Sequence, residues 1–438
     1  MKRETNIPVI EVTFKGIYLL LIFAWIGCKE NTSSKRGNDE IIEISNIIDL
    51  TEGFKNIHSV RLSEIVDSIT FIPFVTNSQS LMGSAQKRME FNPQFIFYNN
   101  IVFDWEGNYL VSIGRRGNGT FEEPQGVFSV VYKENHFYSK GSKFIEYEMN
   151  GKPTGKVRNL YASNEFSSTD FLRSGSLFIA GDNLAVYNYP TTVYFFNTDF
   201  QTVSSRVVTN ADSLPPYLNQ IGDSKFVTYF NDKVLFYNFM NDTIFYVSDT
   251  VMESKWIVNF DEKLRLSTQV MLNFRNLMND YAIERAGGLS YENTKLVQLT
   301  NNKHKVVAVY ETESYIFFHM IEIALFAEPR GLTQPLPYII YYDKKTGKSI
   351  RVEGNGFEDD LLDMDYFFPQ LGIYDSKLIS FIWPFELLDY IEKCKETGRK
   401  VNPRLIELSK KIDSEDNPIL ILAHIIDNRH IIAPHTHL

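Results

Sequence analysis

The sequence predicts an all-β fold, a six-bladed β-propeller with a helical insertion and a C-terminal helical hairpin. Three observations favour it. Short runs rich in Tyr, Phe, Val and Ile alternate with Gly, Asn and Asp turns, and no long stretch before residue 260 shows sustained helical periodicity. A hairpin pattern recurs along the chain at a nearly constant interval. Finally, two apolar segments, one near each end, lack a local hairpin partner, so we expect them to share a sheet.

Composition and charge limit the classes of function. Hydrophobic residues make up 44% of the 438 residues and charged residues 22%, which is enough apolar material for a sizeable core. A disordered chain or a coiled coil is therefore excluded. The formal net charge of -10 has the wrong sign for a protein that neutralises phosphates, so nucleic acid is not an expected partner. Aromatic residues reach 14%, and we expect most of them to fill the spaces between packed sheets rather than to stack on sugars.

The recurring unit is an apolar run, a tight polar turn and a second apolar run, which is typical of a β-hairpin. Its turns are marked by Gly107, Gly151, Asp199, Asp249 and Gly347, at separations of 44, 48, 50 and 98 residues. Four-stranded propeller blades repeat about every 40 to 50 residues, so each marker predicts one blade. The last interval holds either two blades or one blade with an insertion.

The stretch from Leu264 to Arg285 favours the insertion. Its apolar residues have helical spacing, which predicts a helix lying against the ring: Val270, Phe274, Leu277, Met278 and Tyr281. One blade then remains, made of residues 305–309, residues 315–320 and the hairpin at Gly347.

The sixth blade is predicted to be composite. Residues 371–382 and 418–426 would supply its first strands, and residues 68–75 (SITFIPFV) would complete it from the other end of the chain. This closure removes two exposed strand edges. The propeller is expected to span residues 61–430.

Two helices are predicted near the carboxyl end, over residues 385–396 and 404–412. In the first, Leu388, Ile391 and Lys395 lie near one stripe, and the pair is expected to form a hairpin that caps one face. Cys394 is expected to be a small core residue.

The amino terminus predicts export. Residues 17–27 form an apolar run that is too short to span a membrane but suits a signal peptide, which we assign to residues 1–28. The sequence Ile26-Gly27-Cys28 resembles the end of a bacterial lipoprotein cleavage box, which implies lipid attachment at Cys28 and a lipid-anchored place in the cell envelope, periplasmic or on the outer membrane. A buried apolar strand that ends in cysteine is the alternative. Residues 29–60 are assigned to a flexible tether.

Several segments together carry a family resemblance: LSEIVDSITFIPFVT, FDWEGNYLVSIGRRGNGTFEEPQGV, YDKKTGKSI, DMDYFFP and SEDNPILIL. From about residue 62 to residue 426 the chain resembles the six-bladed β-propeller lipoproteins of Bacteroides and its relatives, which are related in pattern to NHL-repeat propellers. The resemblance implies a cell-envelope propeller. It implies little chemistry, because most members have no assigned activity.

The loop GRRGNGTFEEPQG joins the outer strand of one blade to the inner strand of the next. Its charged residues are candidate ligand contacts at the ring mouth: Arg115, Arg116, Glu122 and Glu123. The alternative is an inter-blade connection whose glycines serve the turn and whose charges face water.

Acidic groups at Asp359-Asp360 and at Asp363 and Asp365 have the residue type that glycosidic acid/base chemistry needs, although acidic loops are more often solvated surface. His430, His435 and His437 cluster only at the extreme end. The sequence shows no catalytic triad and predicts no cofactor and no metal. We therefore expect a non-enzymatic envelope module that binds a glycan or a partner protein, with a polysaccharide hydrolase or lyase as the alternative.

Overall fold

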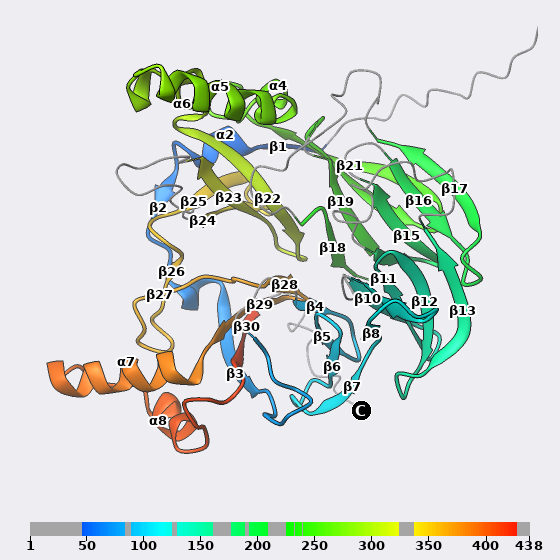
Figure 1. Ribbon diagram of the computed structural model, residues 1–438. Coiled ribbons are helices and arrows are strands. Elements are labelled where there is room, and N and C mark those ends of the chain that lie inside the picture. The colour runs from blue at the N-terminus through cyan, green and yellow to red at the C-terminus, as the bar shows by residue number, and fades with distance from the viewer. Residues whose placement is uncertain are drawn as a thin grey trace, which may run out of the picture. The chain divides into compact units, whose positions relative to one another are not determined.

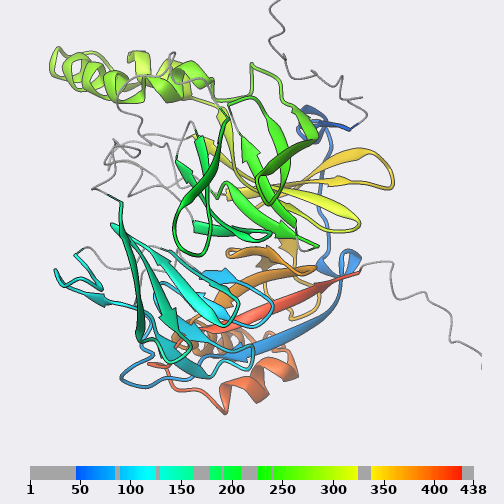
Figure 2. The same ribbon diagram turned by 90° about the vertical axis from the view of Figure 1, so that its right-hand side faces the viewer.

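The structure is a computed structural model that describes residues 46–83, 89–124, 129–160, 177–188, 192–208, 225–231, 233–238, 240–323 and 337–426. Within these ranges, six sheets of four or five strands form the blades of a β-propeller (Figures 1 and 2). Two short two-stranded sheets lie on connections between blades. The predicted fold class is confirmed.

Blades 1 to 3 are four-stranded antiparallel sheets, each built from consecutive strands. Blade 1 contains β4 (Met89–Phe91), β5 (Ile96–Tyr98), β6 (Ile101–Phe103) and β7 (Tyr109–Ser112). Blade 2 contains β10 (Ser129–Lys133), β11 (His136–Lys140), β12 (Lys143–Glu148) and β13 (Pro153–Asn159). Blade 3 contains β14 (Leu177–Ala180), β15 (Asn183–Asn188), β16 (Thr192–Phe196) and β17 (Thr202–Val207).

Blades 4 and 5 each carry a fifth strand, which pairs in parallel with the outermost strand. Blade 4 contains β18 (Val227–Phe230), β19 (Lys233–Asn238), β20 (Thr243–Ser248) and β21 (Val251–Asn259), with β1 (Ile47–Asp49) added at its outer edge. Blade 5 contains β22 (Lys303–Glu311), β23 (Tyr315–Ile323), β24 (Pro337–Asp343) and β25 (Lys348–Val352), with β2 (Ile57–His58) added.

All five predicted turn residues lie where the spacing placed them, in the hairpins that lead into β7, β13, β17, β21 and β25. At Gly107 the turn requires glycine for two reasons. Its φ is 85°, and a Cβ there would lie 2.3 Å from the carbonyl oxygen of Pro73 in the neighbouring blade.

Blade 6 is composite, as predicted. Its inner strands β28 (Gly372–Tyr374), β29 (Lys377–Ile382) and β30 (Ile419–Ile425) come from the end of the chain, and its outer strand β3 (Val66–Pro73) comes from the beginning. Strand β3 pairs antiparallel with β30, and both strands lie side by side in Figure 1. The Asn417 side chain fastens this seam, since its oxygen accepts from the Met82 N–H and its nitrogen donates to the carbonyls of Val75 and Ser80.

The structure corrects the tether boundary. Residues 46–60, which the sequence analysis assigned to the tether, contain β1, β2 and the short helix α2 (Leu50–Gly53). The single turn η1 (Leu62–Glu64) then leads into β3. The physical reason is burial: the Ile48 and Leu50 side chains are fully buried against blades 4 and 5, so this segment gains apolar contacts that a polar tether cannot make.

The helical insertion is confirmed and contains α4 (Thr268–Leu272), α5 (Phe274–Ala286), η3 (Tyr291–Asn293) and α6 (Lys295–Thr300). Val270 and Leu277 are buried in one core cluster with residues of blade 4, and Phe274, Met278 and Tyr281 pack against that cluster. The insertion therefore lies against the ring, as its periodicity predicted.

The helical hairpin is also confirmed, as α7 (Pro384–Thr397) and α8 (Pro403–Ser409). Helix α7 ends at Gly398, whose φ of 70° is the usual left-handed cap. The predicted stripe was wrong by one position: Leu387, Ile391 and Cys394 are buried, whereas Lys395 is exposed. Cys394 belongs to the core cluster that blades 5 and 6 share, as expected.

Aromatic side chains fill the spaces between neighbouring blades. Phe144 of blade 2 lies 5.0 Å from the Phe196 ring and 5.4 Å from the Phe200 ring, both in blade 3. Tyr187 of blade 3 packs edge-on against Phe236 of blade 4 at 4.7 Å. These contacts match the expectation that most aromatic residues serve packing. None of the helices within the described ranges is long and apolar enough to cross a membrane.

Candidate functional site

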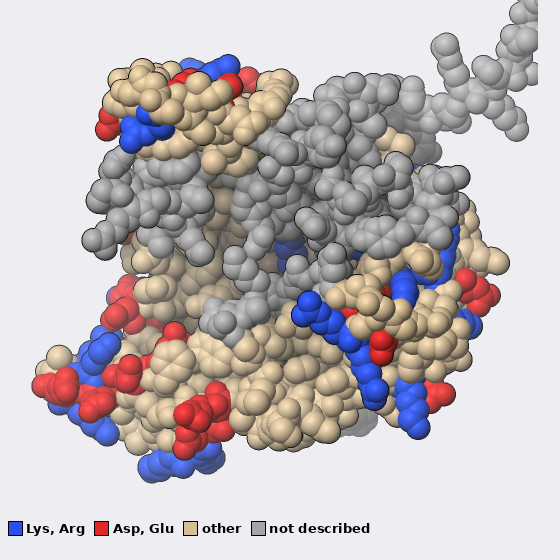
Figure 3. Space-filling model, in the orientation of Figure 1, with Lys and Arg blue, Asp and Glu red and all other residues tan. Residues whose placement is uncertain are grey.

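The connection from blade 5 to blade 6 carries an acidic pocket. It is built on the two-stranded ribbon β26 (Phe357–Glu358) and β27 (Tyr366–Phe367), together with the residues that follow α7. Its volume is about 610 Å³, and it is lined by Glu358, Asp359, Asp360, Asp363, Met364, Asp365, Arg399 and Lys400. In Figure 3, acidic and basic side chains gather at the edge of the molecule where Figure 1 places β26, β27 and α7. The structure thus brings together the four carboxylates that the sequence singled out.

Strand alternation orients the ribbon. Phe357 pairs with Phe367 and both are buried, whereas Glu358 pairs with Tyr366 and both are exposed. Directly paired residues of an antiparallel ribbon point to the same side. Tyr366, which is 51% exposed, therefore stands beside the pocket-lining Glu358.

Asp359 is the buried member of the acidic group, only 3% exposed. One carboxylate oxygen accepts from the backbone N–H groups of Leu361 and Leu362, and the other is buried without a hydrogen-bond partner. Burial raises the pKa of Asp359 above its usual value, and the charges of neighbouring Asp360 and Asp363 act in the same direction.

Asp360 has the opposite environment. Its carboxylate accepts from the N–H of Ser63 at 3.0 Å and from the Ser63 hydroxyl. Partial burial acts to raise the pKa of Asp360, but the hydrogen bonds from Ser63 outweigh it and the pKa is lowered. Since Ser63 belongs to η1, the amino-terminal segment helps to shape the pocket.

Arg399 closes the other side of the pocket. Its guanidinium makes an ion pair with Asp365 at 2.7 Å, donates to the carbonyl of Asp363 and lies 5.8 Å from the ring centre of Tyr390. These three contacts hold a planar donor group next to several acceptors. Sequence reasoning missed Arg399, because nothing in the local pattern links the residues after α7 to the acidic loop.

The loop with Arg115, Arg116, Glu122 and Glu123 joins β7 to β10, as expected, and forms the parallel two-residue strands β8 (Arg115–Arg116) and β9 (Glu122–Glu123). Glu123 is 1% exposed. Its carboxylate accepts from the Ser142 N–H at 2.8 Å, the Ser142 hydroxyl at 2.6 Å and the Lys143 N–H at 2.9 Å, so it anchors the loop to blade 2.

The other three candidates of this loop differ in their surroundings. Glu122 accepts from the Gly119 N–H, while Arg115 and Arg116 are exposed. Arg116 donates to the carbonyl of Pro124 through its Nε at 3.3 Å. Ligand binding by this loop stays a prediction.

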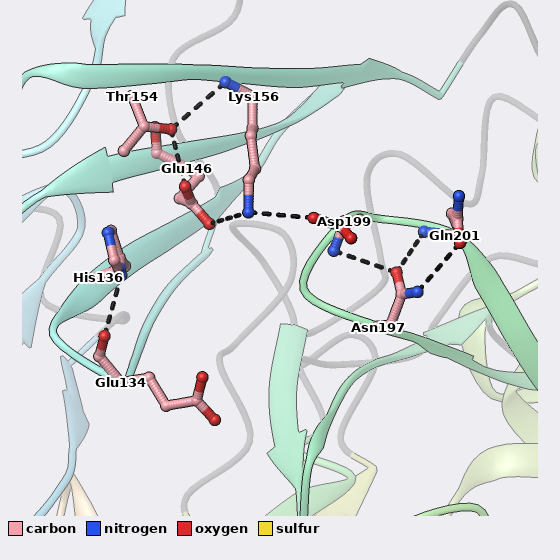
Figure 4. A network of polar contacts seen from close by, with 8 residues as sticks. All are labelled: Glu134, His136, Glu146, Thr154, Lys156, Asn197, Asp199 and Gln201. Carbon is pink, nitrogen blue, oxygen red and sulfur yellow. Dashed lines mark hydrogen bonds and ion pairs between the residues drawn. The ribbon is translucent and has the colours of Figure 1, made fainter.

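A second polar network joins blades 2 and 3 (Figure 4). Lys156 of β13 lies 3.3 Å from the buried Glu146 carboxylate and 3.1 Å from Asp199 in the β16–β17 turn. Thr154 also donates to Glu146 at 2.8 Å. The network therefore ties blade 2 to blade 3, while the Lys156 and Asp199 side chains stay open to solvent.

Two of the sequence predictions lie outside the described residues: Cys28, and the histidines His430, His435 and His437. Within the described ranges, no group of three or more His, Cys, Asp and Glu side chains is arranged to hold a metal ion.

These features define a six-bladed β-propeller with an acidic pocket on the connection between its last two blades. The chain belongs to the family described as Domain of unknown function (DUF4934), whose model matches residues 45–424.

Among solved structures, the chain is similar to a provisionally named exported protein from Bacteroides fragilis, with 15% identity and a TM-score of 0.58 over 87% of this chain and 99% of that one. BamB from Moraxella catarrhalis matches at 11% identity and a TM-score of 0.29, over 67% of each chain, which is too low to carry an argument. No curated protein matches the sequence.

Proposed function

We propose that this protein is an exported, non-enzymatic binding module that recognises an oligosaccharide at the acidic pocket. One observation carries the proposal: carboxylates and the Arg399 guanidinium line one open pocket of about 610 Å³ beside the exposed Tyr366 ring. Carboxylates accept hydrogen bonds from hydroxyl groups, and a guanidinium donates to ring and hydroxyl oxygens. An exposed aromatic ring adds a flat apolar face on which a sugar ring can stack.

Export is supported by the amino-terminal sequence and by the name of the Bacteroides fragilis neighbour, and anchoring by the amino-terminal sequence alone. Lipid attachment at Cys28 would hold the propeller at the membrane, in the manner of the lipoprotein propellers with NHL-like patterns that the sequence resembles. Fractionation tests the anchor. Cys28→Ala should move the protein from the membrane fraction to the soluble fraction, and unchanged partition would contradict the lipoprotein assignment.

A second candidate function is hydrolysis of a glycosidic bond. Asp359 and Asp360 are adjacent carboxylates whose pKa values are shifted in opposite directions, by burial and by the Ser63 hydrogen bonds. Glycosidases use two carboxyl groups whose surroundings shift their pKa values apart. The buried Asp359 oxygen would have to reach the substrate for this chemistry.

The binding test is a thermal-shift screen of neutral, basic and acidic oligosaccharides, because a ligand that prefers the folded state raises the melting temperature. The best ligand is then titrated calorimetrically against Asp363→Asn and Tyr366→Ala. Asn suits position 363, whose φ is 61°. We expect each change to weaken binding by about tenfold, or ~1.4 kcal/mol. Glu292→Gln, an exposed carboxylate on the helical insertion, is the matched control.

Chromatography of the ligand after incubation separates the two functions. An intact ligand supports binding alone. Cleaved products that disappear with Asp359→Asn would establish the hydrolase, and the absence of any oligosaccharide ligand would reject both.

A further inference from the structure

A buried polar cluster lies where the innermost strands of blades 4, 5 and 6 meet. Lys225 lies two residues before β18, and its backbone N–H donates to the Val307 carbonyl of β22 at 2.7 Å. Its ammonium lies 5.7 Å from the ring centre of Tyr310. To the described residues the ammonium makes no hydrogen bond and no salt bridge. Burial lowers the pKa of Lys225, and the Glu90 carboxylate of blade 1 acts against this shift.

His319 of β23 adds a second unpaired nitrogen. The residue is 6% exposed, and its Nε2 is buried without a hydrogen-bond partner. Its ring lies 4.9 Å from the Tyr310 ring and 5.2 Å from the Phe368 ring. Burial, assisted by the Lys225 charge, lowers the pKa of His319 to about 3, so the imidazole is neutral at pH 7 and can donate one hydrogen bond.

Among the described residues, neither nitrogen has a hydrogen-bond partner that would offset its burial. Burying a polar group without a partner costs about 1 to 3 kcal/mol, and a partly buried ammonium costs more. Native proteins rarely keep such groups without a use, such as a ligand that completes their hydrogen bonds. Glu90, Lys225 and Tyr229 are only half-buried, which leaves part of the ring centre in contact with solvent.

We propose that Lys225 and His319 form a second binding site, at the ring centre, for the carboxylate group of a small organic acid. One ammonium and one neutral N–H match a single negative charge with two acceptor oxygens. A dianionic phosphate would need more positive charge, since Glu90 already offsets Lys225. The rings of Tyr310 and Phe368 supply an apolar wall for the carbon skeleton. This site shares no residue with the lining of the acidic pocket, so a test of one proposal does not decide the other.

The first test uses the intact protein and four probes: sodium benzoate, sodium glucuronate, inorganic phosphate and glucose. Calorimetry should show saturable binding of at least one carboxylate and none of glucose. Imidazole ¹⁵N spectra should show a shift of the His319 signal, assigned with His319→Phe, when that carboxylate is added. Phosphate binding that equals or exceeds carboxylate binding would overturn the assignment, as would saturation with neither carboxylate.

Variants then test the two nitrogens. Lys225→Met should weaken carboxylate binding at least tenfold, and His319→Phe should weaken it several-fold. Lys233→Met is the matched control, because Lys233 also lies over a tyrosine ring, at 4.8 Å from the centre of Tyr246, but outside the site. It should leave binding unchanged.

Stability in the absence of ligand separates a binding role from a structural one. If the Lys225 ammonium serves to bind a ligand, Lys225→Met should melt at the same temperature as the unchanged protein or higher. The substitution removes a half-buried charge that has no salt-bridge partner among the described residues. A clearly lower melting temperature for both Lys225→Met and Lys225→Gln would show that the ammonium is structural and would overturn the proposal.

Discussion

Blades 4 to 6 and blades 1 to 3 differ at their outer edges. The segment of residues 46–73 adds β1 to blade 4, then β2 to blade 5, and then becomes the outer strand of blade 6. In the described part of the chain, β7, β13 and β17 end their sheets, and every residue of β17 is at least partly exposed. The comparison teaches that one half of the ring is assembled from local hairpins, whereas the other half is tied by distant segments.

The ties in blades 4 to 6 are specific. The Thr51 hydroxyl accepts from the Asp261 N–H across 210 residues of sequence, and the Glu52 carboxylate accepts from the Ser349 N–H across 297. Such contacts give no stability until the chain has closed a long loop. The tied half therefore depends on its partner segment more than the local half does.

The largest expected effect is deletion of residues 66–76. This change removes β3, exposes the β30 edge and opens the ring, so we expect insoluble or aggregated protein. Removal of residues 29–40, which lie before the described part, should leave folding intact. Solubility and cooperative melting measure both. A soluble deletion protein that melts cooperatively would show that the ring closes in another way.

The second-largest expected effect is that acid destabilises blades 4 to 6. Burial lowers the pKa of His304 in blade 5 to about 4, with Arg351 and Lys303 adding to the shift. The His304 imidazole takes up a proton near pH 6.5 in the unfolded chain but only near pH 4 in the folded chain. The free energy of unfolding therefore keeps its full value above pH 6.5 and decreases as the pH falls toward 4. The loss is on the order of 3 kcal/mol.

Hydrogen exchange at pH 7 and pH 4.5 can locate this effect. Exchange should accelerate first in β22 to β25 and in the segment that holds Phe54, whose ring lies 4.8 Å from His304. His304→Phe should reduce the acid sensitivity of that region. Equal acceleration in blades 2 and 3 would contradict the comparison.

The smallest prediction compares two outer-edge residues. Ile48→Ala removes a fully buried side chain of β1 and should cost about 2 to 4 kcal/mol. Val203→Ala on β17, where the side chain is 54% exposed, should change stability by less than about 0.5 kcal/mol. Denaturant titration of both variants measures the difference, and an effect of Ile48→Ala as small as that expected for Val203→Ala would contradict a stabilising role for β1.

The part of the fold that could be predicted is the part with local signals. Gly107, Gly151 and Asp249 lie in hairpin turns and have a positive φ, which glycine and aspartate adopt more readily than most residues. Their spacing along the sequence therefore predicted the number of blades. Strands β1 and β2 could not be predicted, because a parallel edge strand has no turn next to it and pairs with residues some 200 to 300 positions away.

The candidate sites divide in the same way. Asp359, Asp360, Asp363 and Asp365 are neighbours in sequence, so their shared location followed from the loop itself. The opposite pKa shifts of Asp359 and Asp360 did not, because they depend on burial and on Ser63 from the other end of the chain. The nitrogens of Lys225 and His319, which have no hydrogen-bond partner among the described residues, likewise come together only where several blades meet.

The composite blade also fixes the order of events in biosynthesis. Thr70 and His424, which hydrogen-bond across the seam, are 354 residues apart. A ribosome therefore completes the strands of blades 1 to 5 before β30, the strand that pairs with β3, emerges. Until then neither edge of β3 is paired with another described strand, so we expect the nascent chain to need protection from wrong contacts for longer than a propeller whose strands all pair with neighbours in sequence.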